Sequence, residues 1–232
     1  ISRQLNFRIP RQDRGRLVIR SIAEASVGAL YLAALFNMPI ANAVAILQVS
    51  PLAVAFGAYL FLGEPLGRRR LWAIAIGFVG VMLIVRPGLD GFNIYSLCAM
   101  AGIVALATRD LITRTMTSNL PTLTVATTGS AAVTVLAGTG MLFSDWTPLE
   151  PASVVRLGSA VVWLMLAYFF AIAVMRIGEI GFVAPFRYTG LLAAIIAGII
   201  VFREWPDAWM LLGSAIIVTT GLYLTYRESL ET

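Results

Sequence analysis

The chain has 232 residues, of which 59% are hydrophobic and only 12% are charged. An ordinary soluble domain is about 25% charged, so this chain has too few polar side chains to cover a surface in water, and a soluble globular protein is excluded. Its net charge is +5, it contains no histidine, and Cys98 is its single cysteine. An intramolecular disulfide is therefore excluded, and neither a metal centre nor a cofactor is expected.

Successive apolar runs along the chain predict membrane-spanning helices. Crossing the hydrocarbon of a bilayer takes about 20 residues of helix. The predicted helices cover residues 17–37, 41–62, 71–86, 94–116, 122–143, 153–175, 178–202 and 208–226. Short connections with turn or helix-stop residues separate them, and no connection is long enough to fold as a domain. The predicted fold class is all-α, a polytopic membrane helix bundle.

The positions of arginine predict the orientation of this bundle. All 17 basic residues are arginine, and they concentrate in short segments between apolar runs, chiefly in residues 1–16 and 68–70. A pI near 9.9 would suggest a nucleic-acid partner in a soluble protein, but this placement indicates membrane topology, so no nucleic-acid partner is expected. By the positive-inside rule, both ends of the chain, including a tail at 228–232, are predicted to be cytoplasmic.

Two stretches of the chain superpose at an offset of 140 residues, the difference between 204 and 64. Each contains a long helix that ends at a glutamate with a neighbouring proline, Glu64 in the first and Glu204 in the second, followed by a helix with glycines. Glu64 ends its helix on the predicted cytoplasmic side and Glu204 on the opposite side, so the two units are predicted to be inverted in the membrane. Inverted repeats are typical of secondary transporters, whose substrate sites lie near the bilayer midplane.

The repeat also predicts the division of the chain. Residues 1–16 are predicted to be a cytoplasmic connector, residues 17–91 the remainder of a first repeat, and residues 92–227 a second repeat. The second unit has five predicted helices and the first has three. If the repeats are equal, two further helices are expected before Ile1.

Two segments carry a resemblance to a known family. The stretch "MPIANAVAILQVSPLAVAFGAYLFLGEPL" (38–66) resembles the fourth helix of EamA-type drug/metabolite transporters, and residues 176–207 resemble the ninth. The resemblance implies a fold of two inverted five-helix repeats, of which this chain would hold helices three to ten. Members export amino acids and other metabolites, and some import riboflavin or S-adenosylmethionine. The form "VAPFRYTGLL" resembles a bacterial branch that includes such importers.

The resemblance and the repeat together predict a secondary active transporter that moves a small metabolite across the bacterial inner membrane by alternating access. The alternative is a truncated or accessory integral membrane protein without transport activity. An enzyme is not expected, because the sequence has no His-Glu zinc motif and no Gly-x-Ser-x-Gly. The expected partners are the lipid bilayer, a small-molecule substrate such as an amino acid, carboxylate or vitamin-like metabolite, and, as an open alternative, a second copy of the chain.

Arg187 is the first candidate for the substrate site, because it is a permanent cation inside an apolar run. An arginine at a helix centre costs roughly 2.5–3.5 kcal/mol on insertion scales, so its guanidinium needs polar partners. Three interpretations stay open. Arg187 binds carbonyl groups freed at Pro185, or pairs with a buried acid, or faces a watery cavity and meets an anionic group of the substrate.

Glu24 is the candidate acid for Arg187, because both are predicted to lie at similar depth from the cytoplasmic side. Arg20, four residues earlier, shares a helix face with Glu24 and is an equally good local partner. A carboxylate at this depth is also a candidate carrier of a coupling proton.

Further candidates for the cavity are one amide and several aromatic side chains. Gln48 lies on the second predicted helix, where a hydrogen bond to another helix is the competing interpretation. Tyr31, Trp163 and Tyr188 are candidates for stacking on a flat ligand, with ordinary packing as the alternative. Glu64 and Glu204 are expected to cap helix ends, and Asp110 and Arg114 to form an ionic cluster at a cytoplasmic helix end.

Overall fold

The structure is a computed structural model that describes residues 9–87, 93–116, 122–143, 150–177 and 188–229. Within these ranges every regular element is helical, in agreement with the predicted fold class. The elements are α1 (Arg11–Asn37), α2 (Ile40–Leu47), α3 (Ser50–Leu62), α4 (Arg68–Val85), α5 (Tyr95–Thr115), α6 (Thr122–Met141), α7 (Pro151–Ile177), α9 (Thr189–Ala197), the π-helical segment η2 (Gly198–Phe202) and α10 (Ala208–Ser229).

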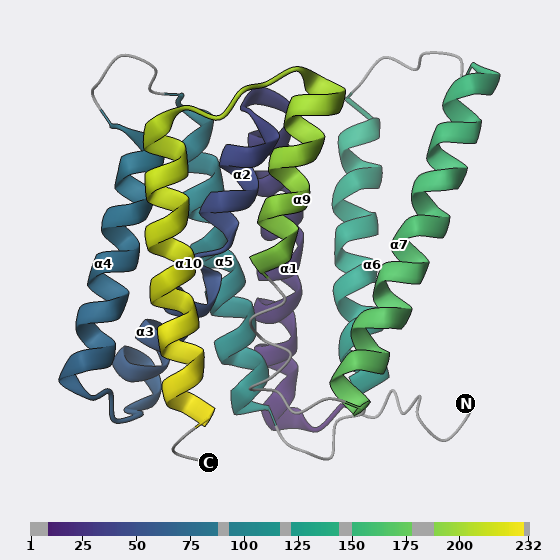
Figure 1. Cartoon of the computed structure of the whole chain (residues 1–232). Helices are drawn as coiled ribbons and strands as arrows, with labels where there is room; N and C mark the ends of the chain where they lie inside the picture. The colour runs from purple at the N-terminus through teal and green to yellow at the C-terminus, as the bar shows by residue number, and fades with distance from the viewer. Residues whose placement is uncertain (1–8, 88–92, 117–121, 144–149, 178–187, 230–232) are drawn as a thin grey trace.

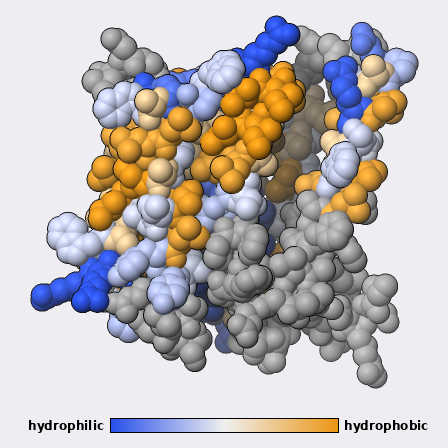
Figure 2. Space-filling view, viewed as in Figure 1, coloured by the Kyte–Doolittle hydropathy of each residue, from blue (hydrophilic) through white to orange (hydrophobic). Residues whose placement is uncertain are grey.

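The helices run up and down between two faces of the molecule (Figure 1). The lower face is defined here as the one where α10 ends, and the upper face as the one where α10 begins. Four helical stretches among the described residues have the length and composition of membrane spans, namely 11–37, 40–62, 95–115 and 208–226. On the face shown in Figure 2, hydrophobic side chains occupy the middle of the bundle, with hydrophilic ones at the upper edge and at the lower left. The chain is therefore a multi-pass membrane protein.

The helix boundaries agree with the predicted runs, with two informative differences. The helix predicted to begin at residue 17 begins at Arg11, because Asp13 in its first turn pairs with Arg16 at 3.4 Å and lets the charged segment continue the helix. The run predicted as one helix over 41–62 is divided between α2 and α3 at Gln48 and Val49. Pro51 follows this break, and proline has no amide hydrogen to continue the helical ladder.

The core is formed where α4 and α10 pack against each other and against α2. Gly80 and Gly213 allow this approach, because a Cβ atom at position 213 would lie 2.5 Å from the carbonyl oxygen of Gly80. Fully buried Ile46, Leu52 and Ile217 belong to the same hydrophobic cluster. On the other side of the bundle, α1 packs against α5 and α6.

The ends of α3 and η2 share one backbone geometry. Gly63 and Arg203 both adopt the left-handed conformation, with φ of 68° and 57°. The amide of Glu64 donates to the carbonyl of Ala58 at 3.3 Å, and the amide of Glu204 donates to the carbonyl of Gly198 at 2.9 Å. These six-residue bonds satisfy carbonyl groups that a helix end leaves open. The two ends lie on opposite faces, the α3 end below and the η2 end above (Figure 1).

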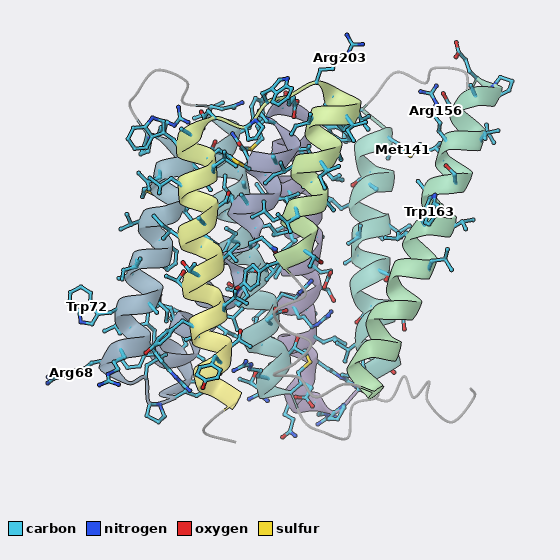
Figure 3. All side chains as sticks on the ribbon, in the orientation of Figure 1. Arg68, Trp72, Met141, Arg156, Trp163 and Arg203 are labelled. Atoms are coloured by element: carbon cyan, nitrogen blue, oxygen red, sulfur yellow. The ribbon has the colours of Figure 1, made fainter. Side chains whose placement is uncertain are left out.

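Arginines lie at both faces but are denser below. Figure 3 places Arg68 at the lower edge and Arg156 and Arg203 at the upper edge. At the upper face Arg86 pairs with Asp207, and the Asp207 carboxylate also accepts a hydrogen bond from the Met210 amide at 2.7 Å. Burial alone would raise the pKa of Asp207, but the Met210 amide and the Arg86 guanidinium together lower it below its ordinary value.

Candidate functional site

A cavity of about 450 Å³ lies between α3, α4, α5 and α10. It extends from the lower ends of these helices, where half-exposed Glu64 and Arg114 line it, to the level where α2 gives way to α3 and α9 begins. The volume is within the range of small-molecule sites. Its polar lining residues are Gln48, Ser50, Glu64, Arg70, Asp110, Thr113, Arg114, Tyr188 and Thr225.

Both signs of charge line the lower part of the cavity. Arg114 and Glu64 form an ion pair at 3.5 Å, with side chains that are 53% and 52% exposed. Asp110 pairs with Arg109 at 2.8 Å, and Arg70 contributes a second cation to the wall. An exposed ion pair of this kind contributes little to the free energy of folding. Arg114 and Glu64 can therefore separate and bind charged groups of a solute instead, at a small cost in free energy.

Gln48 and Tyr188 line the deep end of the cavity. Gln48 is the residue that ends α2, and Tyr188 directly precedes the first turn of α9. Tyr188 is 7% exposed, and its phenol lies against α10, where a Cβ atom at Gly221 would be 1.7 Å from the hydroxyl oxygen. Position 221 therefore admits only glycine while Tyr188 keeps this place.

Gln48 and Tyr188 are separated by the same 140 residues as Glu64 and Glu204. They are candidates on different grounds, one as an amide and the other as an aromatic side chain. The structure brings them to one cavity, with Gln48 at the break between α2 and α3 and Tyr188 directly before α9. Broken helices free backbone groups for a ligand, and such breaks occur where a membrane protein lines a cavity.

Glu24 lies in an ionic cluster that is linked to the cavity wall through Arg109, which also pairs with Asp110. It pairs with Arg20 at 3.4 Å and with Arg109 at 3.1 Å, and Arg20 also donates to the Val125 carbonyl at 3.2 Å. The local partner expected for Glu24 is thus present, and Arg109 of α5 is a partner that sequence spacing did not indicate. The cluster joins α1, α5 and α6, and Glu24 is not among the residues that line the cavity. Arg187, the other partner considered, lies outside the described residues.

Two aromatic candidates also lie away from the cavity. Tyr31 packs against the hydrophobic core. Trp163 is 71% exposed on α7 (Figure 3). Their contact with a substrate stays a prediction from the sequence.

Some lining residues were not indicated by the sequence. Arg70 belongs to an arginine run that predicted topology, and Thr113 and Thr225 are ordinary hydroxyl residues near helix ends. The repeat offset could have directed attention to the cavity, because it relates Gln48 to Tyr188. Within the described residues no group of three or more His, Cys, Asp or Glu side chains could hold a metal ion.

Comparison with known proteins finds similarity to transporters. Residues 2–86 match the family model of the EamA-like transporter family. The chain is 30% identical to a riboflavin transporter of Vibrio cholerae over 84% of this chain and 65% of that protein. It is 28% identical to an S-adenosylmethionine uptake transporter of Rickettsia conorii over 82% of this chain and 64% of that protein. The chain thus spans somewhat less than two thirds of the length of either relative.

A solved crystal structure has the same fold. It superposes with a TM-score of 0.55 at 20% identity, and the match covers 97% of this chain and 80% of the other. The helical fold and the names of the relatives are consistent with the match of residues 2–86 to the EamA-like transporter family.

Proposed function

We propose that this protein is a secondary active transporter that moves a small polar metabolite across the bacterial inner membrane by alternating access. The observation that carries the proposal is the cavity of about 450 Å³, which enters the bundle from the lower face and ends at Gln48 and Tyr188. A polar cavity that stops within a membrane bundle has the form of a transporter open to one side. The lower face is the cytoplasmic one, because the arginines concentrate there.

Two inverted repeats, over 17–91 and 92–227, are part of this proposal. The matching helix ends at Glu64 and Glu204 support it, because they have the same hydrogen bonds and lie on opposite faces. The packing of α4 against α10 also supports it, because these two helices correspond at the repeat offset. Rocking of one repeat against the other would move the opening from one face to the other.

The lining of the cavity indicates a solute with several hydrogen-bonding groups. Gln48 offers an amide, Tyr188 an aromatic side chain and Thr225 a hydroxyl, while Arg114 and Glu64 offer both charges. The relatives named above carry riboflavin and S-adenosylmethionine, two metabolites of different charge. We therefore propose Gln48 and Tyr188 as substrate contacts common to solutes of either kind. Contact of Arg187 with an anionic group stays part of the proposal.

The test is transport by the complete protein in liposomes, with riboflavin, S-adenosylmethionine and a panel of amino acids as solutes. Gln48→Ala is expected to weaken transport about tenfold, the effect of losing one hydrogen bond to substrate. Tyr188→Ala is expected to weaken it by a similar factor, because the aromatic contact with the substrate is lost. Trp72→Ala is the matched control and should transport normally, since its side chain is 70% exposed and does not line the cavity. Arg187→Gln is expected to impair only solutes that carry a carboxylate.

Two results would overturn the proposal. If no solute moves and none raises the melting temperature of the parent protein, the accessory-protein alternative replaces it. If transport occurs but Gln48→Ala and Tyr188→Ala behave like Trp72→Ala, the cavity is not the substrate site.

A further inference from the structure

Two carboxylates are among the described residues that line the cavity, and each is paired with an arginine in a different way. Glu64 meets Arg114 at 3.5 Å, and both side chains are about half exposed. Asp110 meets Arg109 at 2.8 Å, and these side chains are 38% and 25% exposed. Arg114 itself lines the cavity, whereas Arg109 is not among the lining residues. The charge of Asp110 is therefore neutralised from outside the cavity.

The guanidinium of Arg109 bridges the cavity wall and α1. Its Nε and Nη2 both lie 2.8 Å from Oδ1 of Asp110, and its Nη1 donates to Oε1 of Glu24 at 3.1 Å. Successive residues of a helix point in directions about 100° apart, so Arg109 reaches Asp110 only by folding back around α5. The contact with Glu24 keeps the guanidinium in this position.

Glu24 is itself held by a second arginine. Arg20 pairs with Glu24 at 3.4 Å, and its Nε donates to the Thr113 hydroxyl at 3.0 Å. A Cβ atom at Gly129 would lie 2.9 Å from Nη1 of Arg20 and 3.4 Å from Cγ of Glu24, so α6 packs closely over this pair. Arg109 is thus anchored by three helices and cannot turn toward a solute without breaking these contacts.

We infer that Arg109 is a specificity-determining residue, which prevents the cavity from accepting a cationic group at Asp110 and so restricts its solutes to those that are neutral or anionic where they meet α5. The inference rests on the proposed function and adds the charge class of the substrate. A cationic group would have to displace Arg109 from two charge-assisted contacts and leave its guanidinium half-buried beside Arg20. A carboxylate or a phosphate meets no such obstacle, because Arg114 is half exposed and loosely paired.

The Arg109–Asp110 pair contributes no net charge to the cavity wall, because its two charges cancel. Arg109→Gln leaves the negative charge of Asp110 uncompensated, whereas Asp110→Asn leaves the positive charge of Arg109. The two substitutions together remove both charges and restore neutrality. Each single substitution therefore shifts the electrostatic potential of the cavity in the opposite direction, and the double variant cancels the shift.

The test measures this potential with a cysteine in the cavity wall of the complete protein in detergent, where reagents reach both faces. Cys98→Ala removes the native cysteine. Leu106→Cys then places a thiol among the lining residues, one helical turn before Asp110, so that the two Cβ atoms are roughly 5–6 Å apart. Reaction rates are measured with two methanethiosulfonates of similar size, one with a trimethylammonium group and one with a sulfonate group. The quantity compared is the ratio of the cationic to the anionic rate.

This ratio should not exceed that of a small thiol in solution when Arg109 and Asp110 are both present. Arg109→Gln should raise it about tenfold, because a unit negative charge roughly 6 Å away attracts one reagent and repels the other. Asp110→Asn should lower it by a similar factor, and the double variant should return it to the starting value.

Two control variants keep the charge balance of the cavity wall. Arg109→Lys retains the positive charge and should change the ratio by less than about twofold. Arg68→Gln removes an exposed arginine at the lower edge that does not line the cavity, and its effect should be equally small because solvent screens it (Figure 3). A purely structural role of Arg109 would change both rates in the same direction and leave their ratio unaltered.

The outcomes separate the two proposals. If Leu106→Cys reacts with neither reagent in any variant, the cavity is closed to water, and the proposed function is overturned together with the specificity of Arg109. If Leu106→Cys reacts but Arg109→Gln leaves the ratio unchanged or lowers it, only the role of Arg109 is overturned. Where Arg109→Gln folds poorly, the double variant is compared with Asp110→Asn, since this comparison removes the same positive charge without leaving an uncompensated carboxylate. The ratio should again rise about tenfold, and no rise overturns the inference.

Discussion

The ends of α3 and η2 have the same backbone and different surroundings. Each has a left-handed residue followed by a glutamate whose amide bonds six residues back. Glu64 then points to a cavity and forms a long ion pair with Arg114, whereas Glu204 binds the amide of Ile40 on a neighbouring helix. The local motif therefore ends the helix, and the neighbouring helices decide whether its carboxylate opens to solvent or closes a contact.

The largest expected effect on stability comes from a substitution at the left-handed residue of the α3 end, which is glycine there and arginine at the η2 end. Valine at position 63 is expected to lower the free energy of unfolding by about 1–2 kcal/mol, because an L side chain in this conformation is strained. A Cβ atom there meets nothing within 4 Å, so the cost is conformational rather than a clash. Melting of Gly63→Val in detergent measures it. Gly67→Val is the matched control, since Gly67 has equally open space but an ordinary φ of −61° and should change little.

Removal of the glutamate side chain should lower the free energy of unfolding more at the η2 end than at the α3 end, and this difference should be smaller than the effect at position 63. Glu204→Ala is expected to lower the free energy of unfolding by about 1 kcal/mol, the usual effect of losing a side chain that caps a helix amide. Glu64→Ala should cost less than about 0.5 kcal/mol, because it loses only a half-exposed ion pair. Parallel melting curves measure both. Equal losses would show that the difference in surroundings has no energetic consequence.

Glycine in place of Arg203 should make the upper end more like the lower one. Arg203→Gly is expected to raise the free energy of unfolding by about 0.5 kcal/mol, because glycine adopts φ near 57° without strain but loses more chain entropy on folding. Arg86→Gly also relieves a left-handed residue, but it removes the ion pair with Asp207 and should gain nothing. A lower melting temperature for Arg203→Gly would mean that its side chain has a stabilising role.

The smallest expected effect is the pH dependence of the stability that Asp207 contributes at the upper face. The pKa of Asp207 is lowered in the folded protein, so its contribution to stability is present above its unfolded pKa and is lost as pH falls through the folded value. The unfolded value is about 3.9, which places the loss below about pH 4. Asp207→Asn should flatten the melting temperature in this range. Because the side chain is half exposed, the effect should stay below about 1 kcal/mol.

Much of the architecture could be predicted from the sequence. Hydropathy predicted the helices 94–116 and 122–143 to within two residues of α5 and α6. The break between α2 and α3 was missed, because a hydrophobic run continues through Gln48 and only the helix geometry near Pro51 interrupts it. Gln48 and Tyr188 were selected as candidates, but their position in one cavity depends on how α2, α9 and α10 pack.

The composition by itself determined that this chain folds in a bilayer, because no arrangement in water could cover so much apolar surface. The sequence also predicts the repeat, since turn residues and glutamates at helix ends act locally. Only the tertiary structure decided that Glu24 pairs with Arg109, 85 residues away, and that the lower half has a cavity where the upper half is packed. Such partners depend on the rotation and crossing of helices, which the spacing of residues along one helix does not determine.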